Sequence, residues 1–338
     1  MKGSGFALFT ALVLVAFLAV PAYSGTIRDD GDDSEYLALG ASSAYASVGR
    51  VDGTTWSYGF LASGTLIDSQ WVLTAAHVVQ GATSLTFTIG TTEYVADGWV
   101  ANSKFSSGNL GAGNDMTLIH LGSAVSGVVP ATLYTGSDEL GRVGTSVGYG
   151  MTGTGVGGYI EDWSNIQKRA GENMVDAFYP VRGKGTPNVI LMDFDRPGVA
   201  AESSYGSADP LDLEYLIAPG DSGGGLFADF MVSGKLTAQL IGVHSFGWGR
   251  LDGIPDSDYG DVSGDTRVSQ YISWVEGAMA PPKGGKGGGK GGGKAAGAAD
   301  FVLGDYEYYS LDGMATVPEP ATMALVALGG LAVLRRRK

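Results

Sequence analysis

The chain of 338 residues contains no cysteine, and histidine occurs only three times. Without cysteine the protein has no disulfide, no zinc-thiolate site and no thiol nucleophile, so its core alone must hold the fold. Basic residues are also scarce: 21 Lys and Arg stand against 35 Asp and Glu, and the formal net charge is -14. Binding to a phosphate backbone depends on Lys and Arg, so this balance excludes a nucleic-acid partner.

Glycine, by contrast, is abundant at 56 residues, and 44% of the chain is hydrophobic. From about residue 45 to residue 279, short apolar or alternating runs are separated by Gly, Asn, Asp and Ser, as in 56–67, 84–90, 93–100 and 235–246. This pattern is typical of strands joined by tight turns and predicts an all-β domain. Only residues 268–279 have apolar side chains at helical spacing, which predicts a helix at the end of the folded segment.

The N-terminus has the features of an export signal. Met1-Lys2 precedes an apolar run over residues 6–20, and Ala22-Tyr23-Ser24 places small residues where a signal peptidase cuts. We therefore expect residues 1–24 to be a signal peptide that is cleaved before Gly25, and residues 25–280 to form the folded domain. The alternative is a membrane anchor, but the apolar run is short and polar, acidic sequence follows it.

The C-terminal part of the chain has three consecutive features. Residues 281–299 form a Lys/Gly-rich segment with little to bury, which is expected to be a flexible linker, and residues 300–316 follow as a spacer. Residues 317–338 then contain Pro318-Glu319-Pro320, an apolar stretch over 321–334 and a terminal basic cluster.

This last segment resembles the PEP-CTERM sorting signals of Gram-negative bacteria. The resemblance implies recognition by an exosortase, transient membrane contact through a hydrophobic helix, and delivery to the cell envelope, the cell surface or the extracellular matrix. A permanent tail anchor is the alternative. Because 14 residues at about 1.5 Å each reach only ~21 Å, they are short for a hydrocarbon core of ~30 Å.

Three motifs carry residue types that together make a nucleophile. His77 ends the run Trp71-Val-Leu-Thr-Ala-Ala-His77, Asp115 lies in Asn114-Asp115-Met-Thr-Leu-Ile, and Ser222 lies in Gly220-Asp221-Ser222-Gly223-Gly224. A serine hydroxyl needs an imidazole to take its proton, and the imidazole needs a carboxylate to fix its tautomer. Each motif alone is compatible with a turn or a cap, but the three in this order indicate nucleophilic catalysis.

These motifs resemble those of the trypsin-like (chymotrypsin-fold) serine proteases from about residue 48 to residue 275. Further matching segments are Ser63 to Ile67, Gly148-Tyr149-Gly150, Gly242 to Gly247 and Thr266-Arg267-Val268. The resemblance implies two antiparallel six-stranded Greek-key barrels followed by a C-terminal helix. It also implies a serine endopeptidase that acts on protein or peptide substrates and needs no cofactor.

Carried over residue by residue, the resemblance makes Ser222 the nucleophile, His77 the general base and Asp115 the residue that orients His77. The backbone N–H groups of Gly220 and Ser222 would form the oxyanion hole. The rival hypothesis is a surface-displayed binding or matrix protein on an inactive protease fold.

The resemblance also suggests a substrate-binding set. Leu216 stands six residues before the nucleophile, at the expected floor of the specificity pocket, where members that cleave after Lys or Arg have Asp. Ser245, Phe246 and Gly247 match the strand against which substrate backbone is laid. His244 matches a histidine that receives acidic side chains in glutamyl endopeptidases. Apolar or small residues are therefore expected before the scissile bond, with Glu or Asp as the alternative.

One family feature is missing from the sequence. Many members use a freed Ile-Val-Gly-Gly terminus to pair with the Asp before the nucleophile, here Asp221. The chain has no such segment, and the acidic run 29–33 is expected to be solvated. Asp221 then pairs either with another partner or with the terminus that signal removal exposes.

Two remaining groups are assigned no function. His120 follows Asp115 in an apolar strand and is expected to be structural. Asp256, Asp258 and Asp261 offer hard oxygen ligands for Ca²⁺, but their spacing does not match an EF-hand. A solvated acidic turn is the preferred interpretation, and we predict no metal there.

Overall fold

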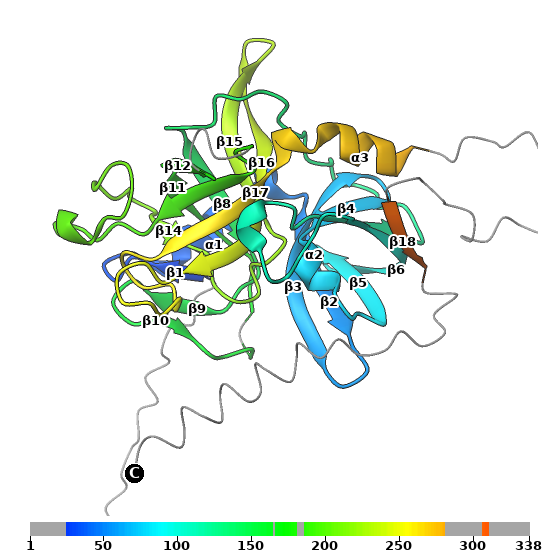
Figure 1. The fold of residues 1–338 in the computed structure, drawn as a ribbon, viewed down its shortest axis with the longest axis horizontal. Coiled ribbons are helices and arrows are strands. Elements are labelled where there is room, and N and C mark those ends of the chain that lie inside the picture. The colour runs from blue at the N-terminus through cyan, green and yellow to red at the C-terminus, as the bar shows by residue number, and fades with distance from the viewer. Residues whose placement is uncertain (1–24, 165, 181–185, 281–305, 311–338) are drawn as a thin grey trace, which may run out of the picture.

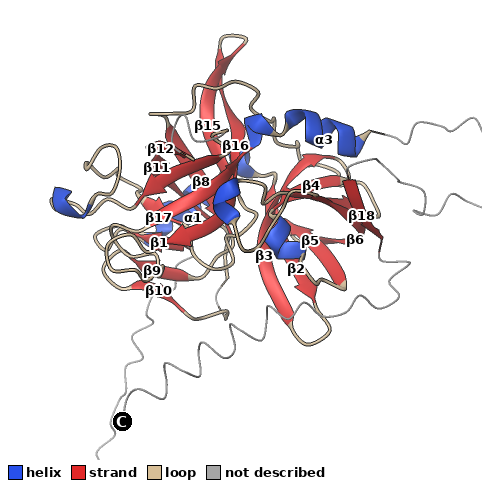
Figure 2. Ribbon diagram, viewed as in Figure 1, coloured by secondary structure: helices blue, strands red, loops and turns tan. Residues whose placement is uncertain are grey.

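The structure is a computed structural model that describes residues 25–164, 166–180, 186–280 and 306–310, and strands predominate in it (Figures 1 and 2). The all-β prediction is therefore confirmed. Two large sheets lie side by side (Figure 1).

The N-terminal sheet closes into a barrel. Its strands are β2 (Val48–Thr54), β3 (Gly59–Asp68), β4 (Trp71–Thr74), β5 (Ser84–Ile89), β6 (Thr92–Asn102), β7 (Thr117–Leu121) and β18 (Tyr306–Ser310). They are ordered β18-β6-β5-β2-β3-β4-β7, and a further β6–β7 pairing closes β2 to β7 into the expected six-stranded barrel. Strand β18 is an addition on the outside of this barrel and pairs antiparallel with β6.

The C-terminal sheet is curled and remains open. Its strands are β8 (Val143–Gly148), β11 (Arg169–Met174), β12 (Ala177–Tyr179), β13 (Val189–Asp193), β15 (Gly225–Val232), β16 (Lys235–Trp248) and β17 (Val262–Arg267). The order is β11-β8-β15-β16-β17-β13-β12, and no pairing within the described ranges joins β11 to β12. The second barrel of the expected fold is thus a seven-stranded half-barrel.

A small third sheet joins the start of the domain to the segment before Ser222. It contains β1 (Gly25–Ile27), β9 (Thr152–Thr154), β10 (Gly158–Ile160) and β14 (Tyr215–Leu216). Strand β1 lies in its middle, parallel to β9 and antiparallel to β14. The first residues after the predicted signal peptide are therefore buried structural residues rather than a loose end.

Helices are few and short. The α-helices are α1 (Asp33–Gly40), α2 (Ala76–Val79) and α3 (Ile272–Met279), and the 3-10 turns are η1 (Ser43–Tyr45), η2 (Leu110–Ala112), η3 (Ala200–Glu202) and η4 (Val268–Gln270). The predicted terminal helix is confirmed, with a 3-10 turn at its start. Its buried residues, Val275 and Ala278, pack onto the same core as the N-terminal barrel.

The acidic run is exposed at Asp29, Asp30 and Asp32, as expected, and only Asp33, the first residue of α1, is partly buried. The Asp32 carboxylate caps the helix by accepting a hydrogen bond from the Ser34 N–H at 2.9 Å. Asp33 accepts hydrogen bonds from the Arg169 guanidinium at 2.6 Å and 3.0 Å, and the Arg169 side chain is fully buried. A buried guanidinium needs a paired carboxylate, and the run supplies it.

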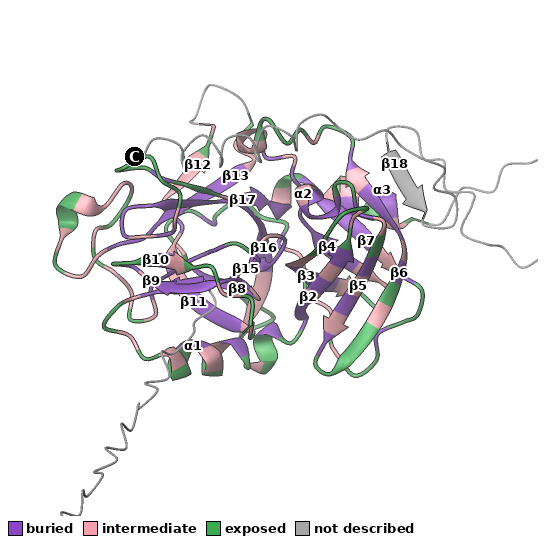
Figure 3. Cartoon of the chain, turned by 90° about the horizontal axis from the view of Figure 1, so that it is seen from below, coloured by how far each residue is buried: buried purple, intermediate pink, exposed green. Residues whose placement is uncertain are grey.

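The two large sheets share one hydrophobic core. Phe87 and Leu118 of the first sheet belong to the same buried cluster as Val147 and Phe227 of the second. Figure 3 shows the buried strands of both sheets meeting in the middle of the molecule. The two sheets are therefore packed against each other through one core.

The expected signal peptide (1–24), the linker (281–299) and the sorting signal (317–338) lie outside the described residues. The expected spacer (300–316) is described only at β18, which was not predicted. Among the described residues, no helix is long and apolar enough to cross a membrane.

Candidate functional site

His77 and Asp115 approach each other at the open end of the N-terminal barrel. His77 lies on α2, directly after β4, and Asp115 lies just before β7; β4 and β7 are paired neighbours in the barrel. The His77 Nδ1 atom is 2.6 Å from Asp115 Oδ2, and the His77 backbone N–H donates to Asp115 Oδ1 at 2.9 Å. Asp115 is buried while the His77 side chain is 27% exposed, so the imidazole bridges the interior and the surface.

A β-bulge brings a third residue onto this carboxylate. The register between β16 and β17 slips after His244, so that Ser245 is the extra residue of the bulge. Its hydroxyl donates to Asp115 Oδ2 at 2.6 Å. The sequence assigned Ser245 to substrate binding, and the structure adds this contact with Asp115.

Ser222 lies in a turn that needs glycine on both sides. Gly220 has φ +100° and Gly223 has φ +79°, a region that side chains rarely adopt. A Cβ at Gly220 would lie 3.0 Å from the Tyr149 carbonyl, so the chain also leaves no space for one. These two glycines are what allow the turn to present Ser222 outward.

Ser63 on β3 ties this turn to the N-terminal barrel. Its N–H donates to the Ser222 carbonyl at 2.9 Å, and its hydroxyl donates to the Gly220 carbonyl at 2.9 Å. The same hydroxyl accepts a hydrogen bond from the Tyr149 N–H at 2.9 Å. The sequence quoted Ser63 only as part of a matching motif, and its role as a clamp was missed.

The N–H groups of Gly220 and Ser222 are unpaired. Within the described part of the chain, neither group donates a hydrogen bond to a backbone or side-chain acceptor. Both lie in a well-packed turn, where an unpaired donor is unusual. Two such donors, one on each side of Asp221, are available to a negatively charged oxygen.

Asp221 is completely buried and held by three donors. Its carboxylate accepts hydrogen bonds from the Gly150 N–H at 2.8 Å, the Ala218 N–H at 2.9 Å and the Tyr215 hydroxyl at 3.0 Å. Burial raises the pKa of Asp221, while these hydrogen bonds and the nearby His244 lower it. Of the two alternatives left by the sequence, the structure thus provides another partner for Asp221.

A cleft of about 210 Å³ lies between His77 and Ser222, and pockets of this kind are where substrates bind. Its lining also includes Tyr58, Phe60 and Leu61 of the β2–β3 hairpin. The structure brings His77 and Ser222 to one cleft, yet it forms no hydrogen bond between the Ser222 hydroxyl and the imidazole within the described residues. Such contacts are often long without substrate.

None of the five predicted substrate-binding residues is in this lining, and two of them, Leu216 and His244, are enclosed in the interior. Leu216 is 1% exposed and packs with Phe194 and Tyr259. His244 is fully buried, and its Nδ1 is 2.5 Å from Oδ1 of the equally buried Asp265, its partner on β17. The structure therefore places both residues behind the surface rather than on it.

The end of β16 has the geometry expected of a substrate-binding strand. The pairing of β16 with β15 stops at Val243, while Phe246 and Gly247 remain paired with β17. One edge of this segment thus has no strand partner among the described residues. Gly247 is exposed, and a Cβ there would meet nothing within 4 Å. A peptide in extended conformation can pair along such an edge.

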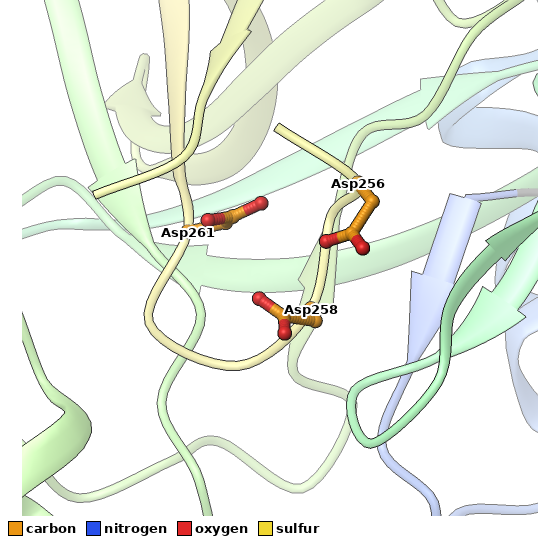
Figure 4. Close-up of side chains that lie close together, drawn as sticks. All are labelled: Asp256, Asp258 and Asp261. Atoms are coloured by element: carbon orange, nitrogen blue, oxygen red, sulfur yellow. The ribbon is translucent and has the colours of Figure 1, made fainter. Parts of the chain in front are cut away.

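The acidic residues Asp256, Asp258 and Asp261 do come together, with one ligand oxygen of each within 4.8 Å of the others (Figure 4). Asp261 is buried, and its two oxygens accept hydrogen bonds from the Ser257 N–H at 2.9 Å and the Arg250 N–H at 3.3 Å. Burial raises the pKa of Asp261 to about 7 and that of Asp258 to about 6, each aided by the neighbouring carboxylates. Both oxygens of Asp261 thus help to order the loop, and we assign no metal to the cluster.

His120 is held by a separate partner. Its Nδ1 lies 2.6 Å from Asp97 Oδ1, and its ring meets Trp71 edge to face at 4.7 Å between centroids. His120, Asp97 and Trp71 are all partly exposed, and none of them lines the cleft. The structural interpretation of His120 is consistent with these contacts.

Comparison with known proteins gives two family matches. The family described as Trypsin matches residues 41–275, and the PEP-CTERM protein-sorting motif matches residues 316–338. Urokinase-type plasminogen activator of Gallus gallus is 26% identical over 244 residues, which are 65% of this chain and 51% of that protein. The chain therefore spans about half the length of this relative.

Two solved structures were also found to be similar. An HL collagenase is 20% identical with a TM-score of 0.49, over 75% of this chain and 96% of that chain. Mouse neuropsin, a serine protease expressed in the limbic system, is 18% identical with a TM-score of 0.48, over 68% of this chain and 94% of that chain.

Proposed function

The chain belongs to the trypsin family, and we propose that it is an exported serine endopeptidase with Ser222 as nucleophile, His77 as general base and Asp115 as orienting carboxylate. The observation that carries the proposal is the 2.6 Å contact between His77 Nδ1 and the buried Asp115 Oδ2. This contact fixes the proton on Nδ1, so that Nε2 is the basic nitrogen and is available to Ser222.

The reaction follows from these roles. The Ser222 hydroxyl attacks the carbonyl carbon of a peptide bond while His77 takes its proton, and a tetrahedral oxyanion forms. His77 then gives this proton to the leaving amine, the C–N bond breaks, and the acyl group remains on Ser222 as an ester. Water attacks the ester with His77 again as base, which releases the acid and restores the serine.

The two unpaired N–H groups suit the charge that develops. The oxyanion needs donors that are already oriented, and the Gly220 and Ser222 N–H groups have no competing acceptor in the described chain. Loss of one such donor typically lowers kcat on the order of 10²-fold to 10³-fold. Ser63 also stabilises this turn, because it donates hydrogen bonds to the carbonyls of Gly220 and Ser222.

A fluorophosphonate probe tests this proposal on the full chain. The wild type should be labelled and should digest casein, whereas Ser222→Ala and His77→Ala should do neither. Circular dichroism of the three proteins separates a lost nucleophile from a lost fold. If the folded wild type is not labelled, the rival hypothesis of a binding or matrix protein on an inactive fold replaces this one.

The sorting motif indicates export to the cell envelope or surface and exosortase-type sorting. We further propose that a signal peptidase cuts before Gly25 and that residues 321–334 contact the membrane transiently. Mass spectrometry of the protein from its host would give both mature ends. A mature chain that retains residues 1–24 would contradict cleavage before Gly25. A mature chain that retains the basic C-terminus would contradict the transient membrane contact of residues 321–334.

A further inference from the structure

The carboxylate next to the nucleophile forms no ion pair with another described residue. None of the ion pairs between described residues involves Asp221. The nearby His244 directs its Nδ1 at Asp265 instead. A carboxylate that is 0% exposed must then be satisfied by neutral donors. Two are backbone N–H groups, and the third is the Tyr215 hydroxyl.

Tyr215 is enclosed on several sides. It is 1% exposed, and its ring fills the space beside two glycines, Gly25 on β1 and Gly171 on β11. A Cβ at either glycine would overlap the Tyr215 side chain. Gly25 also has φ +64°, so residue 25 is suited to glycine both by its backbone and by the ring against it.

Strand β1 connects this tyrosine to the opposite wall of the Asp221 pocket. Its Thr26 pairs with Leu216 on one side and with Gly153 on the other. The Gly25 N–H donates to the Met151 carbonyl at 2.5 Å, so it is already used as an amide donor. The N-terminal strand thus fixes the spacing between the segments that supply the donors to Asp221.

We propose that Tyr215 is a positioning residue of the active site, whose hydroxyl holds the Asp221 carboxylate and thereby fixes the turn that carries Gly220 and Ser222. The inference rests on the proposed function. With Tyr215 in this role the turn is assembled by the folded chain itself, and the enzyme does not need a freed α-amine at Gly25. Removal of the residues before Gly25 then serves export rather than activation.

The central test is Tyr215→Phe, which removes one oxygen from a buried ring. A hydrogen bond to a charged group is worth roughly 1.5–3 kcal/mol, so kcat/KM should fall about 10-fold to 100-fold. The acid limb of the kcat/KM profile should also move to higher pH, because ionised Asp221 loses a donor. Tyr36→Phe is the matched control: Tyr36 is buried and packs near Tyr215, but its hydroxyl donates to the Glu214 carbonyl.

The second arm changes the N-terminus. A chain that begins at Tyr23 should have the same kcat/KM as one that begins at Gly25, because the Gly25 nitrogen donates to Met151 in either case. If the longer chain is inactive while Tyr215→Phe keeps the wild-type rate and profile, the α-amine positions Asp221 and the inference is wrong. If the longer chain is as active as the one that begins at Gly25 and Tyr215→Phe changes neither kcat/KM nor its pH profile, the inference is wrong as well.

A readout without catalysis keeps the two proposals apart. The carboxyl ¹³C shift of Asp221 can be titrated in wild type and in Tyr215→Phe, and its pKa should be higher in the variant. A double-mutant cycle with Asp221→Asn should show that the stability cost of Tyr215→Phe falls once the charge is gone. If the wild type is not labelled but both results hold, the proposed function fails and the Tyr215 contact stands. If neither holds, the inference fails even in an active enzyme.

Discussion

The hydroxyl of Ser245 lies 2.6 Å from Asp115 Oδ2, the same oxygen that meets His77 Nδ1. A β-bulge in β16 makes this possible, since in a regular strand Ser245 would alternate to the other face. The proposed orienting carboxylate is therefore fixed from both large sheets.

Ser245→Ala should lower kcat/KM by about 10-fold, because Asp115 loses a charge-assisted hydrogen bond worth roughly 1.5–3 kcal/mol while its contacts with His77 remain. Ser263→Ala is the control, since Ser263 is equally buried but its hydroxyl donates to the Met192 carbonyl. Steady-state kinetics on one peptide substrate measures both variants. An unchanged Ser245→Ala would show that Asp115 needs no support beyond His77.

Gly220→Ala should abolish most activity, with a loss on the order of 10²-fold to 10³-fold as the N–H donors move out of place. The φ of +100° and the crowding by Tyr149 both oppose a side chain at this position. Gly234→Ala has a similar φ of +82° but open space around it, so it should cost only about 1 kcal/mol of stability and no activity. If Gly220→Ala and Gly234→Ala lower kcat/KM to a similar extent, the loss in Gly220→Ala comes from backbone strain and not from displaced N–H donors.

The parts of the molecule that the sequence predicted are those governed by local pattern. Alternating apolar residues separated by turn residues located the strands of the first barrel, and the motifs around His77, Asp115 and Ser222 predicted the candidate site. Helix α1 was missed because residues 33–40 lack the apolar spacing of an amphipathic helix. Its stability depends on a remote partner, Arg169, which no local pattern reveals.

The contacts that position the candidate site could not be predicted from local sequence patterns either. Tyr215 donates to Asp221, and its strand β14 also pairs with β1 from the start of the domain, a pairing that is not encoded in either segment alone. The same holds for His244, whose position in the sequence resembled a pocket wall. Its pairing with Asp265 follows from the register between two strands, and it leaves the histidine buried.

Asp33→Asn should destabilise the fold by about 3–5 kcal/mol, because it removes the carboxylate charge that the buried guanidinium of Arg169 contacts. Glu35→Gln, an exposed change in the first turn of the same helix, is the control and should have little effect. Urea unfolding followed by tryptophan fluorescence measures both. If the two variants unfold at the same urea concentration, the Asp33–Arg169 pair contributes nothing to stability.

The stability of the fold should fall as pH rises from about 4.5 to about 8. Burial raises the pKa of Glu214 from 4.5 to about 8, so in this range the folded state holds a proton that the unfolded state has released. The contribution of Glu214 is then fully present at the acid end and declines by up to about 1.4 kcal/mol per pH unit, in addition to the contributions of other carboxyls with raised pKa values. Glu214→Gln should flatten this slope in thermal melts, whereas the exposed Glu93→Gln should not.

Cleavage should occur after apolar or small residues and not after Lys or Arg. The position expected at the pocket floor is Leu216, which is buried among Phe194 and Tyr259 and offers no charge to a basic side chain. The alternative is cleavage after Glu or Asp. Cleavage after Glu or Asp would require His244 Nε2 to reach the substrate carboxylate. This nitrogen has no hydrogen-bond partner among the described residues.

Mass spectrometry of products from a peptide library distinguishes these outcomes. Cleavage after Glu or Asp that disappears in His244→Gln would establish the alternative and give the buried His244–Asp265 pair a role in recognition. Cleavage after apolar residues that persists in His244→Gln would leave this pair a structural role. A preference for Lys or Arg would contradict the prediction and show that an acidic side chain from elsewhere in the chain reaches the pocket, because residue 216 is a leucine.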